Sequence, residues 1–362
     1  MTRALALSLV LLLGMAGAVH AYDFNVNGYV DGELQAVQAN KDLTDNNSSS
    51  EWNNSFGNQS EVLLFIGTDP SEDVSLVSEI AYRQAFNDID VWQAMVNWMA
   101  SGEQLQMKAG KFWFPYGIEH RYAYSTVNPL VSRPFETHSS GRLLEVKAPM
   151  SLARSWQDQG AGVHGKVALG QSDMNLMYDL AVSNGLSGMS LTPATPDNND
   201  NKTFGGMVSL MPAEGVEVGG SFAYGKYDTG GHNNYMLAGG HAVYSMIEGL
   251  DVMGEFRYGS VDKAGIAGAD LSEMLFYGTV SYKIPMEGIE YVEPAVRFGW
   301  FDPNTDSASS DDTFMQVAFG LNVSPAEHFA LKGEFQLNKE SVASGATEPD
   351  NNELLFQAVL GW

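Results

Sequence analysis

The stretch DFNVNGYVDGELQAV, residues 23–37, alternates apolar and polar side chains. Successive side chains of a β-strand point to opposite faces, so the pattern predicts a strand with one apolar face and one water-facing face. The apolar face would hold Phe24, Val26, Val30, Leu34 and Ala36, and the polar face Asn25, Asn27, Tyr29, Asp31, Glu33 and Gln35.

The same alternation returns along the chain, for example in NLMYDLAVS (175–183), LDVMGEFRYG (250–259) and HFALKGEFQLN (328–338). Short and long connections alternate between these segments, which number sixteen. Both chain ends then fall on the short-turn side. This arrangement is typical of a closed antiparallel transmembrane β-barrel with short periplasmic turns and long extracellular loops. The seven short connections lie near residues 69, 100, 170, 212, 247, 286 and 325.

A soluble β-sandwich or a secreted β-solenoid is the alternative all-β fold. The polar face of the strands is too charged to pack as a second core, so we expect the apolar face to contact outer-membrane lipid. Barrel closure then leaves no unpaired backbone edge in hydrocarbon. Aromatic residues near the strand ends fit the girdles that lie at lipid headgroups: Tyr29, Tyr82, Trp92, Trp98, Tyr224, Tyr258, Tyr282, Trp300 and Trp362.

The N-terminal segment predicts export. Residues 1–21 carry Arg3, a short apolar run and small residues at the end, which is typical of a cleaved signal peptide. A membrane anchor is disfavoured because the run is too short to span a bilayer. We expect residues 22–362 to form one barrel in the outer membrane of a Gram-negative bacterium. The net charge of −25 argues against nucleic acid as a partner, and the chain has no cysteine for disulfides.

One segment interrupts the alternation. KFWFPYGIEHRYAYSTVNPLVSRPFE, residues 111–136, follows the fifth predicted strand and opens the longest interval without a strand pattern, about 115–157. Pro115, Pro129 and Pro134 lack a backbone donor and suit a chain that leaves the sheet. Long loops in compact proteins are usually functional.

The charge of this region differs in sign from the rest. Residues 105–158 hold seven basic and four acidic side chains, so their net charge is +3. A narrow constriction focuses the field of such charges, and rings of Arg or Lys select anions in pores. The structural alternative is that the basic groups pair with nearby carboxylates and only hold the loop in place.

MKAGKFWFPYGIEHR and NPLVSRPFE resemble the phosphate-selective porin O and P family and its sixteen-stranded relatives. The G-x-F-x-x-P-x-G signature falls on Gly110, Phe112, Pro115 and Gly117, and the second motif on Asn128, Pro129, Ser132, Arg133, Pro134 and Phe135. The resemblance implies a trimeric outer-membrane channel whose loop after strand five folds into the lumen and narrows it. Selective members line the pore with a ladder of arginines and lysines, and this sequence has few such residues outside the loop.

We therefore expect a homotrimeric porin for passive diffusion of small hydrophilic solutes, favouring small anions. The expected constriction residues are Lys108, Lys111, Arg121, Arg133, Arg142, Arg154, Glu119 and Glu136, and the expected pore-wall residues are Arg83, Arg257, Arg297 and Lys332. The alternatives are a channel selective for phosphate or organic acids, and a barrel that serves as a sheath or partner for another exported protein.

Other chemistry has little support in the sequence. We expect no enzymatic activity and no resident metal, because the histidines form no His-x-x-x-His or Glu-x-x-His pattern and no Gly-x-Ser-x-Gly elbow is present. The acidic segments 195–203 and 302–312 offer oxygen ligands for Ca²⁺, but their spacing matches no known calcium loop. Solvated external loops, partly bridged by divalent cations to lipopolysaccharide, are the expected alternative.

Overall fold

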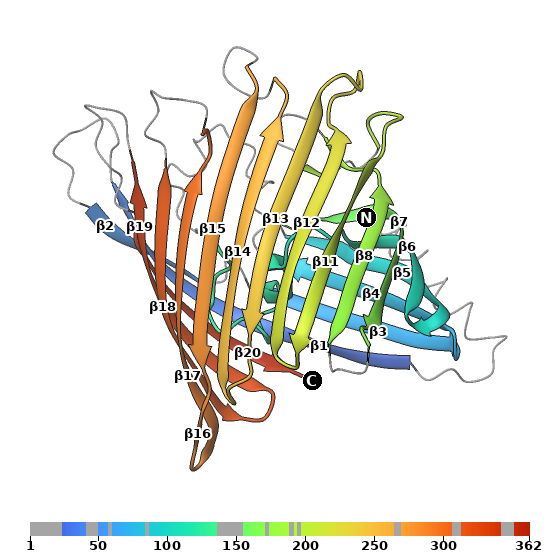
Figure 1. Cartoon of the computed structure of the whole chain (residues 1–362). Coiled ribbons are helices and arrows are strands. Elements are labelled where there is room, and N and C mark those ends of the chain that lie inside the picture. The colour runs from blue at the N-terminus through green and yellow to red at the C-terminus, as the bar shows by residue number, and fades with distance from the viewer. Residues whose placement is uncertain are drawn as a thin grey trace.

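The strands form one closed antiparallel barrel (Figure 1). The computed structural model describes residues 24–40, 50–56, 60–83, 87–135, 155–170, 174–187, 192–193, 197–263, 269–305, 313–341 and 351–362. The expected signal peptide lies outside these ranges. Within them, no helix is both long and apolar enough to cross a membrane.

The barrel sheet contains 18 segments that make sixteen strands. β2 and β3 pair with successive parts of β1, and β15 and β16 pair with successive parts of β17, so each of these two couples forms one strand (18 − 2 = 16). The predicted strand number is confirmed. The segments are β1 (Phe24–Asn40), β2 (Ser50–Phe56), β3 (Glu61–Ser71), β4 (Val74–Arg83), β5 (Asp88–Glu103), β6 (Leu105–Trp113), β7 (Gln157–Ala168), β8 (Asn175–Ser183), β11 (Thr203–Ala213), β12 (Val216–Lys226), β13 (Asn234–Tyr244), β14 (Leu250–Val261), β15 (Leu271–Tyr282), β16 (Ile284–Met286), β17 (Ile289–Asp302), β18 (Phe314–Ala326), β19 (Phe329–Glu340) and β20 (Glu353–Gly361).

The first and last strands close the barrel. β1 pairs antiparallel with β20 from Tyr29 opposite Gly361 to Val37 opposite Glu353. Beyond this ladder, the Trp362 amide donates to the Gly28 carbonyl at 3.0 Å. A short hairpin of β9 (Leu186–Ser187) and β10 (Thr192–Pro193) lies outside the barrel sheet, in a long connection.

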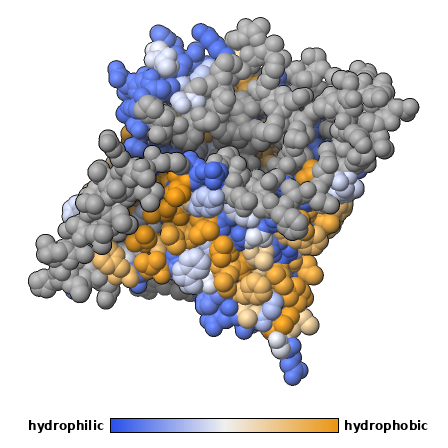
Figure 2. All heavy atoms as spheres, turned by 180° about the vertical axis from the view of Figure 1, so that it is seen from behind, coloured by the Kyte–Doolittle hydropathy of each residue, from blue (hydrophilic) through white to orange (hydrophobic). Residues whose placement is uncertain are grey.

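The barrel has its apolar side chains outside and its polar side chains inside. On β17, Val296 and Phe298 are 43% and 40% exposed, whereas Arg297 between them is 2% exposed. On β1 the predicted polar face is buried in the interior, with Asp31, Glu33 and Gln35. Figure 2 shows apolar side chains spread over the outer surface of the barrel wall, with hydrophilic ones at the tip below them. The outer surface therefore suits lipid, as expected for a transmembrane barrel.

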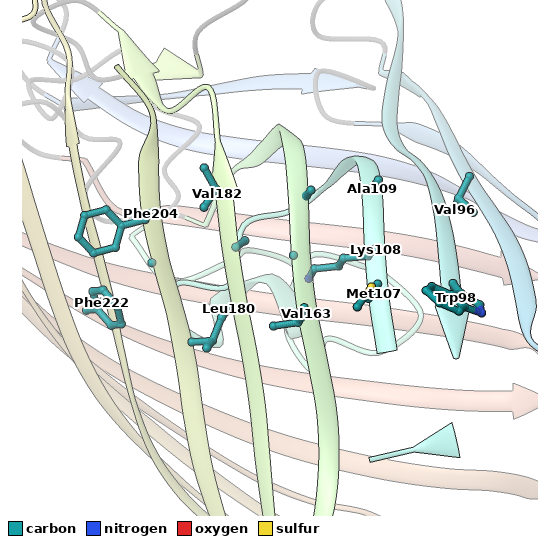
Figure 3. Close-up of a pocket in the computed structure, with 14 residues that line it drawn as sticks. Val96, Trp98, Met107, Lys108, Ala109, Val163, Leu180, Val182, Phe204 and Phe222 are labelled. Atoms are coloured by element: carbon teal, nitrogen blue, oxygen red, sulfur yellow. The ribbon is translucent and has the colours of Figure 1, made fainter. Parts of the chain in front are cut away.

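Small side chains make a shallow apolar hollow of about 730 Å³ on this outer surface, across β5 to β12. Figure 3 shows Val96, Trp98 and Met107 on one side of it and Leu180, Val182, Phe204 and Phe222 on the other. Ala109 and Ala161 lie between these two groups of large side chains in the strand order. The apolar lining agrees with contact between this face and lipid chains.

The predicted position in the aromatic girdle is wrong for two residues. Tyr29 and Trp92 are buried in a cluster with Leu63, Ala81 and Val359. Tyr29 lies on the inward parity of β1, where its hydroxyl donates to Glu61 at 2.5 Å. A bulge in the β4–β5 ladder leaves Trp92 without an opposite residue and turns it inward.

The orientation of the two faces is testable at Val296. Its neighbours across the sheet are Val280 and Phe319, which are also exposed. We expect Val296→Arg to lower the free energy of unfolding in lipid vesicles by about 2–4 kcal/mol, because a charge then meets hydrocarbon near the middle of the strand. Val296→Leu is the control and should leave chemical denaturation unchanged. An equally stable arginine variant would contradict the lipid-facing assignment.

Candidate functional site

A loop inside the barrel is the candidate functional site. The lumen loop, residues 114–156, joins the fifth barrel strand β6 to the sixth, β7, as predicted. Its described parts are residues 114–135, with the short 3-10 helix η2 (Glu119–Tyr122), and residues 155–156. Every anchor described below joins this loop to an inward side chain of the barrel wall.

The loop enters the lumen through a glycine. The Gly117 amide donates to Ser221 Oγ at 3.1 Å, and the Ile118 amide donates to Glu255 Oε1 at 3.0 Å. Gly117 has a φ of +72°, and a Cβ there would lie 2.3 Å from Arg257 Nη2. Only glycine fits this conformation and this close approach. This contact gives a physical reason for the last glycine of the G-x-F-x-x-P-x-G motif.

A carboxylate clamp holds the loop at β19. Glu334 accepts hydrogen bonds from the Val131 amide at 2.7 Å, the Ser132 amide at 2.8 Å and Ser132 Oγ at 2.6 Å. Arg297 on β17 donates to the Ser132 carbonyl at 2.7 Å and to Ser132 Oγ at 2.6 Å. It also lies 3.5 Å from Glu334, and both charged groups are buried. The clamp therefore satisfies donors and acceptors of the loop with one buried ion pair.

Lys332, two residues before Glu334, binds loop carbonyls instead of amides. Its Nζ donates to the Asn128 carbonyl at 2.6 Å and also to the Ser125 carbonyl. Asn128 in turn accepts from the Leu130 amide and donates to the Ser132 carbonyl, which folds the segment into a tight turn. The second motif of the resemblance, from Asn128 to Phe135, is thus the part of the loop fastened to β17 and β19.

The wall on the other side of β20, at β1 and β4, supplies a second set of anchors. Ser125 Oγ donates to Asp31 Oδ2 on β1 at 2.5 Å, and the Tyr124 hydroxyl donates to Glu79 Oε1 on β4 at 2.8 Å. Trp113 Nε1 donates to the Tyr124 hydroxyl at 3.2 Å. Burial beside Glu79 raises the pKa of Tyr124, so this hydroxyl keeps its proton and remains a donor.

Arg121 forms a further anchor. Its two terminal nitrogens each donate to Glu217 on β12 at 2.8 Å, and Glu217 also contacts His241 Nε2 at 3.0 Å. Such a bidentate pair is stronger and more directional than a single contact. The Arg121 side chain is still 31% exposed, so part of it faces the open lumen.

The described basic residues of the expected constriction contact different carboxylates. Lys108 binds Asp179 at 2.6 Å, Lys111 binds Asp90 at 3.2 Å, and Arg133 lies 3.8 Å from Glu119, which is 1% exposed. Glu136, Arg142 and Arg154 lie outside the described residues. Contact between any of these groups and a solute stays a prediction.

The expected pore-wall residues divide into two groups. Arg257, Arg297 and Lys332 are buried, and their contacts are with Glu255 or with the lumen loop. Arg83 is partly exposed and lies 3.8 Å from Asp90. In this structure the buried wall residues therefore hold the lumen loop. This is the structural alternative that the sequence left open for the basic residues of the loop region. Their contact with solutes also stays a prediction.

Sequence reasoning missed two kinds of residue. The first is the set of inward carboxylates that bind loop amides and hydroxyls: Asp31, Glu79, Glu255 and Glu334. Their position on the polar face of the alternating pattern was the sequence signal that could have identified them. The second is Lys166 on β7, outside the basic window, which forms no hydrogen bond or ion pair with any residue that the structure describes and lines a lumen cavity.

The metal prediction stays untested. Among the described residues, no three His, Asp or Glu side chains are placed to hold a metal ion. The segments 195–203 and 302–312 are described only from 197 and up to 305, so calcium binding there stays a prediction.

Comparison with known proteins gives a consistent fold. The sequence matches no protein-family model and no curated protein. An anion-selective porin from Comamonas acidovorans is similar in structure, with a TM-score of 0.60 over 94% of this chain and 100% of that chain, at 13% identity. The outer-membrane channel DcaP of Acinetobacter baumannii has a TM-score of 0.59 over 94% and 98% of the two chains, at 13% identity.

OmpF of Salmonella typhi, in a complex with daunomycin, has a TM-score of 0.58 over 94% of this chain and 98% of that chain, at 11% identity. This chain has the sixteen-stranded porin fold. At such low identity the likeness shows the fold alone, an outer-membrane barrel, and does not show which solute passes or how the chains assemble.

Removal of the clamp carboxylate at β19 should make the lumen loop mobile. Glu334→Ala leaves the buried Arg297 without this carboxylate, which costs about 3–5 kcal/mol. We expect single-channel recordings of this variant to show larger and noisier current steps, because the loop detaches from β17 and β19. Glu327→Gln, an exposed change on the neighbouring turn, is the matched control. Quiet currents of normal size from Glu334→Ala would contradict the clamp.

His120 predicts acid sensitivity of the loop. Burial, with the Arg121 guanidinium beside the ring, lowers the pKa of His120 to about 4. A histidine in a detached loop titrates at about 6.5. The detached state therefore binds the proton first, and attachment weakens as pH falls from about 6.5 to about 4 and is then constant.

We expect current noise to rise over this pH window in the wild type. The His120→Asn variant should lack that component while keeping any response from titrating carboxylates. Identical pH profiles for the two proteins would rule out His120 as the origin.

Proposed function

We propose that this protein is an outer-membrane porin, a homotrimer that lets small hydrophilic solutes diffuse through a lumen narrowed by residues 114–156. The observation that carries the proposal is the anchoring of the loop to both sides of the lumen, at β1 and β4 and at β12, β14, β17 and β19. A sheath or partner barrel has no need of such a loop. We assign the protein no catalytic activity.

Solute contact is assigned to the loop cations that keep exposed surface. Arg121 and Arg133 are 31% and 21% exposed, in contrast to the buried Arg257 and Arg297. Two partly exposed cations support a mild preference for small anions over strong selection by a long basic ladder. The structural neighbour from Comamonas acidovorans is an anion-selective porin, which agrees with this direction.

A channel selective for phosphate or for organic acids is the second candidate. It is favoured by the motif around Gly117 and Ser132, and disfavoured by the ion pairs that occupy Lys108, Arg257 and Arg297 on the wall. Bridging of the acidic external loops to lipopolysaccharide by divalent cations remains part of the proposal for the assembled trimer.

The reversal potential in a KCl gradient tests the porin function. We expect anion preference at both 0.1 M and about 1 M salt, because loop charge at the mouth is screened over about 10 Å at 0.1 M while a constriction acts at contact. Arg133→Gln should move the potential toward cations, whereas Lys202→Gln, which removes one exposed charge outside the lumen, should not. Cation preference at all salts would refute the anion preference, and absence of conductance would refute the porin.

A further inference from the structure

A second polar site lies near the short-turn end of the lumen. A cavity of about 360 Å³ is lined by inward side chains of β6, β7, β8 and β11. Its polar members are Gln106, His164, Lys166, Tyr178, Asp179 and Ser209, with Glu103 at the end of β5. Gln106 and Lys166 are near the short-turn ends of their strands, which places the cavity at that end of the lumen.

Strand register sets the spacing within this cavity. Gln106 lies opposite His164, and His164 lies opposite Asp179 on the next strand. Lys166 is two residues further along β7, opposite Met177, so it is a diagonal neighbour of Asp179. Diagonal positions on neighbouring strands are about 7–8 Å apart, a separation that one small molecule can bridge.

The hydrogen bonds already made leave particular atoms available. Asn97 accepts from His164 Nε2 at 2.8 Å and donates to Gln106 Oε1 at 2.7 Å. The N–H groups of the Gln106 amide therefore remain available to a ligand. Asp179 Oδ2 is occupied by Lys108 at 2.6 Å. Asp179 Oδ1 is buried and has no hydrogen-bond partner among the described residues, which is costly unless a ligand or water supplies a donor.

We propose that this cavity binds a small organic acid that carries a hydroxyl or ammonium group next to its carboxylate, that is, a hydroxy acid or an amino acid. The carboxylate lies on the Lys166 ammonium and the Gln106 amide, and the donor of the ligand reaches Asp179 Oδ1. Lys108 neutralises the charge of Asp179, so Lys166 remains the cation that recognises the carboxylate. The site rests on the proposed porin function, because the solute reaches it through the lumen.

Lactate and propionate form the matched pair of probes. Both carry one carboxylate on a three-carbon chain, and only lactate has the neighbouring hydroxyl. Binding is measured by saturation-transfer NMR on the folded barrel in detergent, which does not depend on conductance. We expect lactate to bind about tenfold more tightly than propionate, because a hydrogen bond to a charged acceptor has about this value.

Lys166→Gln should lower the binding affinity for both acids about tenfold, because it removes the charge-assisted contact. Lys202→Gln, which removes the same charge outside the lumen, should change neither. Equal affinities for the two acids would overturn the recognition of the donor and leave an anion site only. Binding unchanged by Lys166→Gln would overturn the site.

The same preparations in planar bilayers separate the two proposals. Ion conductance together with lactate binding that Lys166→Gln leaves unchanged overturns the site and keeps the porin. Lactate binding that depends on Lys166, in a barrel that conducts no ions, supports the site and overturns the porin function.

Discussion

The constraint on which this structure depends is that the barrel ladder uses up the backbone hydrogen bonds of the wall. Closure through β1 and β20 pairs the backbone groups of the wall strands with one another, so few are left to bind a loop. A loop that enters the lumen brings its own amides and carbonyls, which must be satisfied there. The loop satisfies some of these groups itself, as in the turn at Asn128. Inward side chains of the wall and water must satisfy the others, so the wall carries buried charges at the points of contact.

The sign of each buried wall charge follows from this requirement. Glu334 meets loop amides, so a carboxylate acceptor is needed, whereas Lys332 meets loop carbonyls and must donate. Arg297 binds the Ser132 carbonyl and hydroxyl and also neutralises Glu334. Arg297 and Lys332 at wall positions are therefore explained by the polarity of the loop backbone.

The barrel was predictable because its signal is local and repeated. The parity of residues 23–37 predicts the inward face of β1 correctly, and the alternation of turns predicts sixteen strands and a loop after the fifth. The anchors were not predictable, because Ser132 and Glu334 are 202 residues apart and meet only through closure. Trp92 was misassigned because a single-residue bulge changes the parity without a sequence signal.

The same logic identifies where selectivity can arise. A cation whose hydrogen bonds go to a carboxylate or to the loop has little charge left to offer a solute, so buried pairs such as Arg257 with Glu255 contribute a fixed, nearly neutral wall. Charge that acts on solutes must come from groups with exposed surface. Among the described basic residues of the lumen, Arg83, Lys111, Arg121 and Arg133 keep 21–33% of their side-chain surface exposed, and Lys166 lines the cavity of β6 to β11. A solute with one carboxylate would therefore meet successive weak sites instead of a single trap, which suits passage better than tight binding.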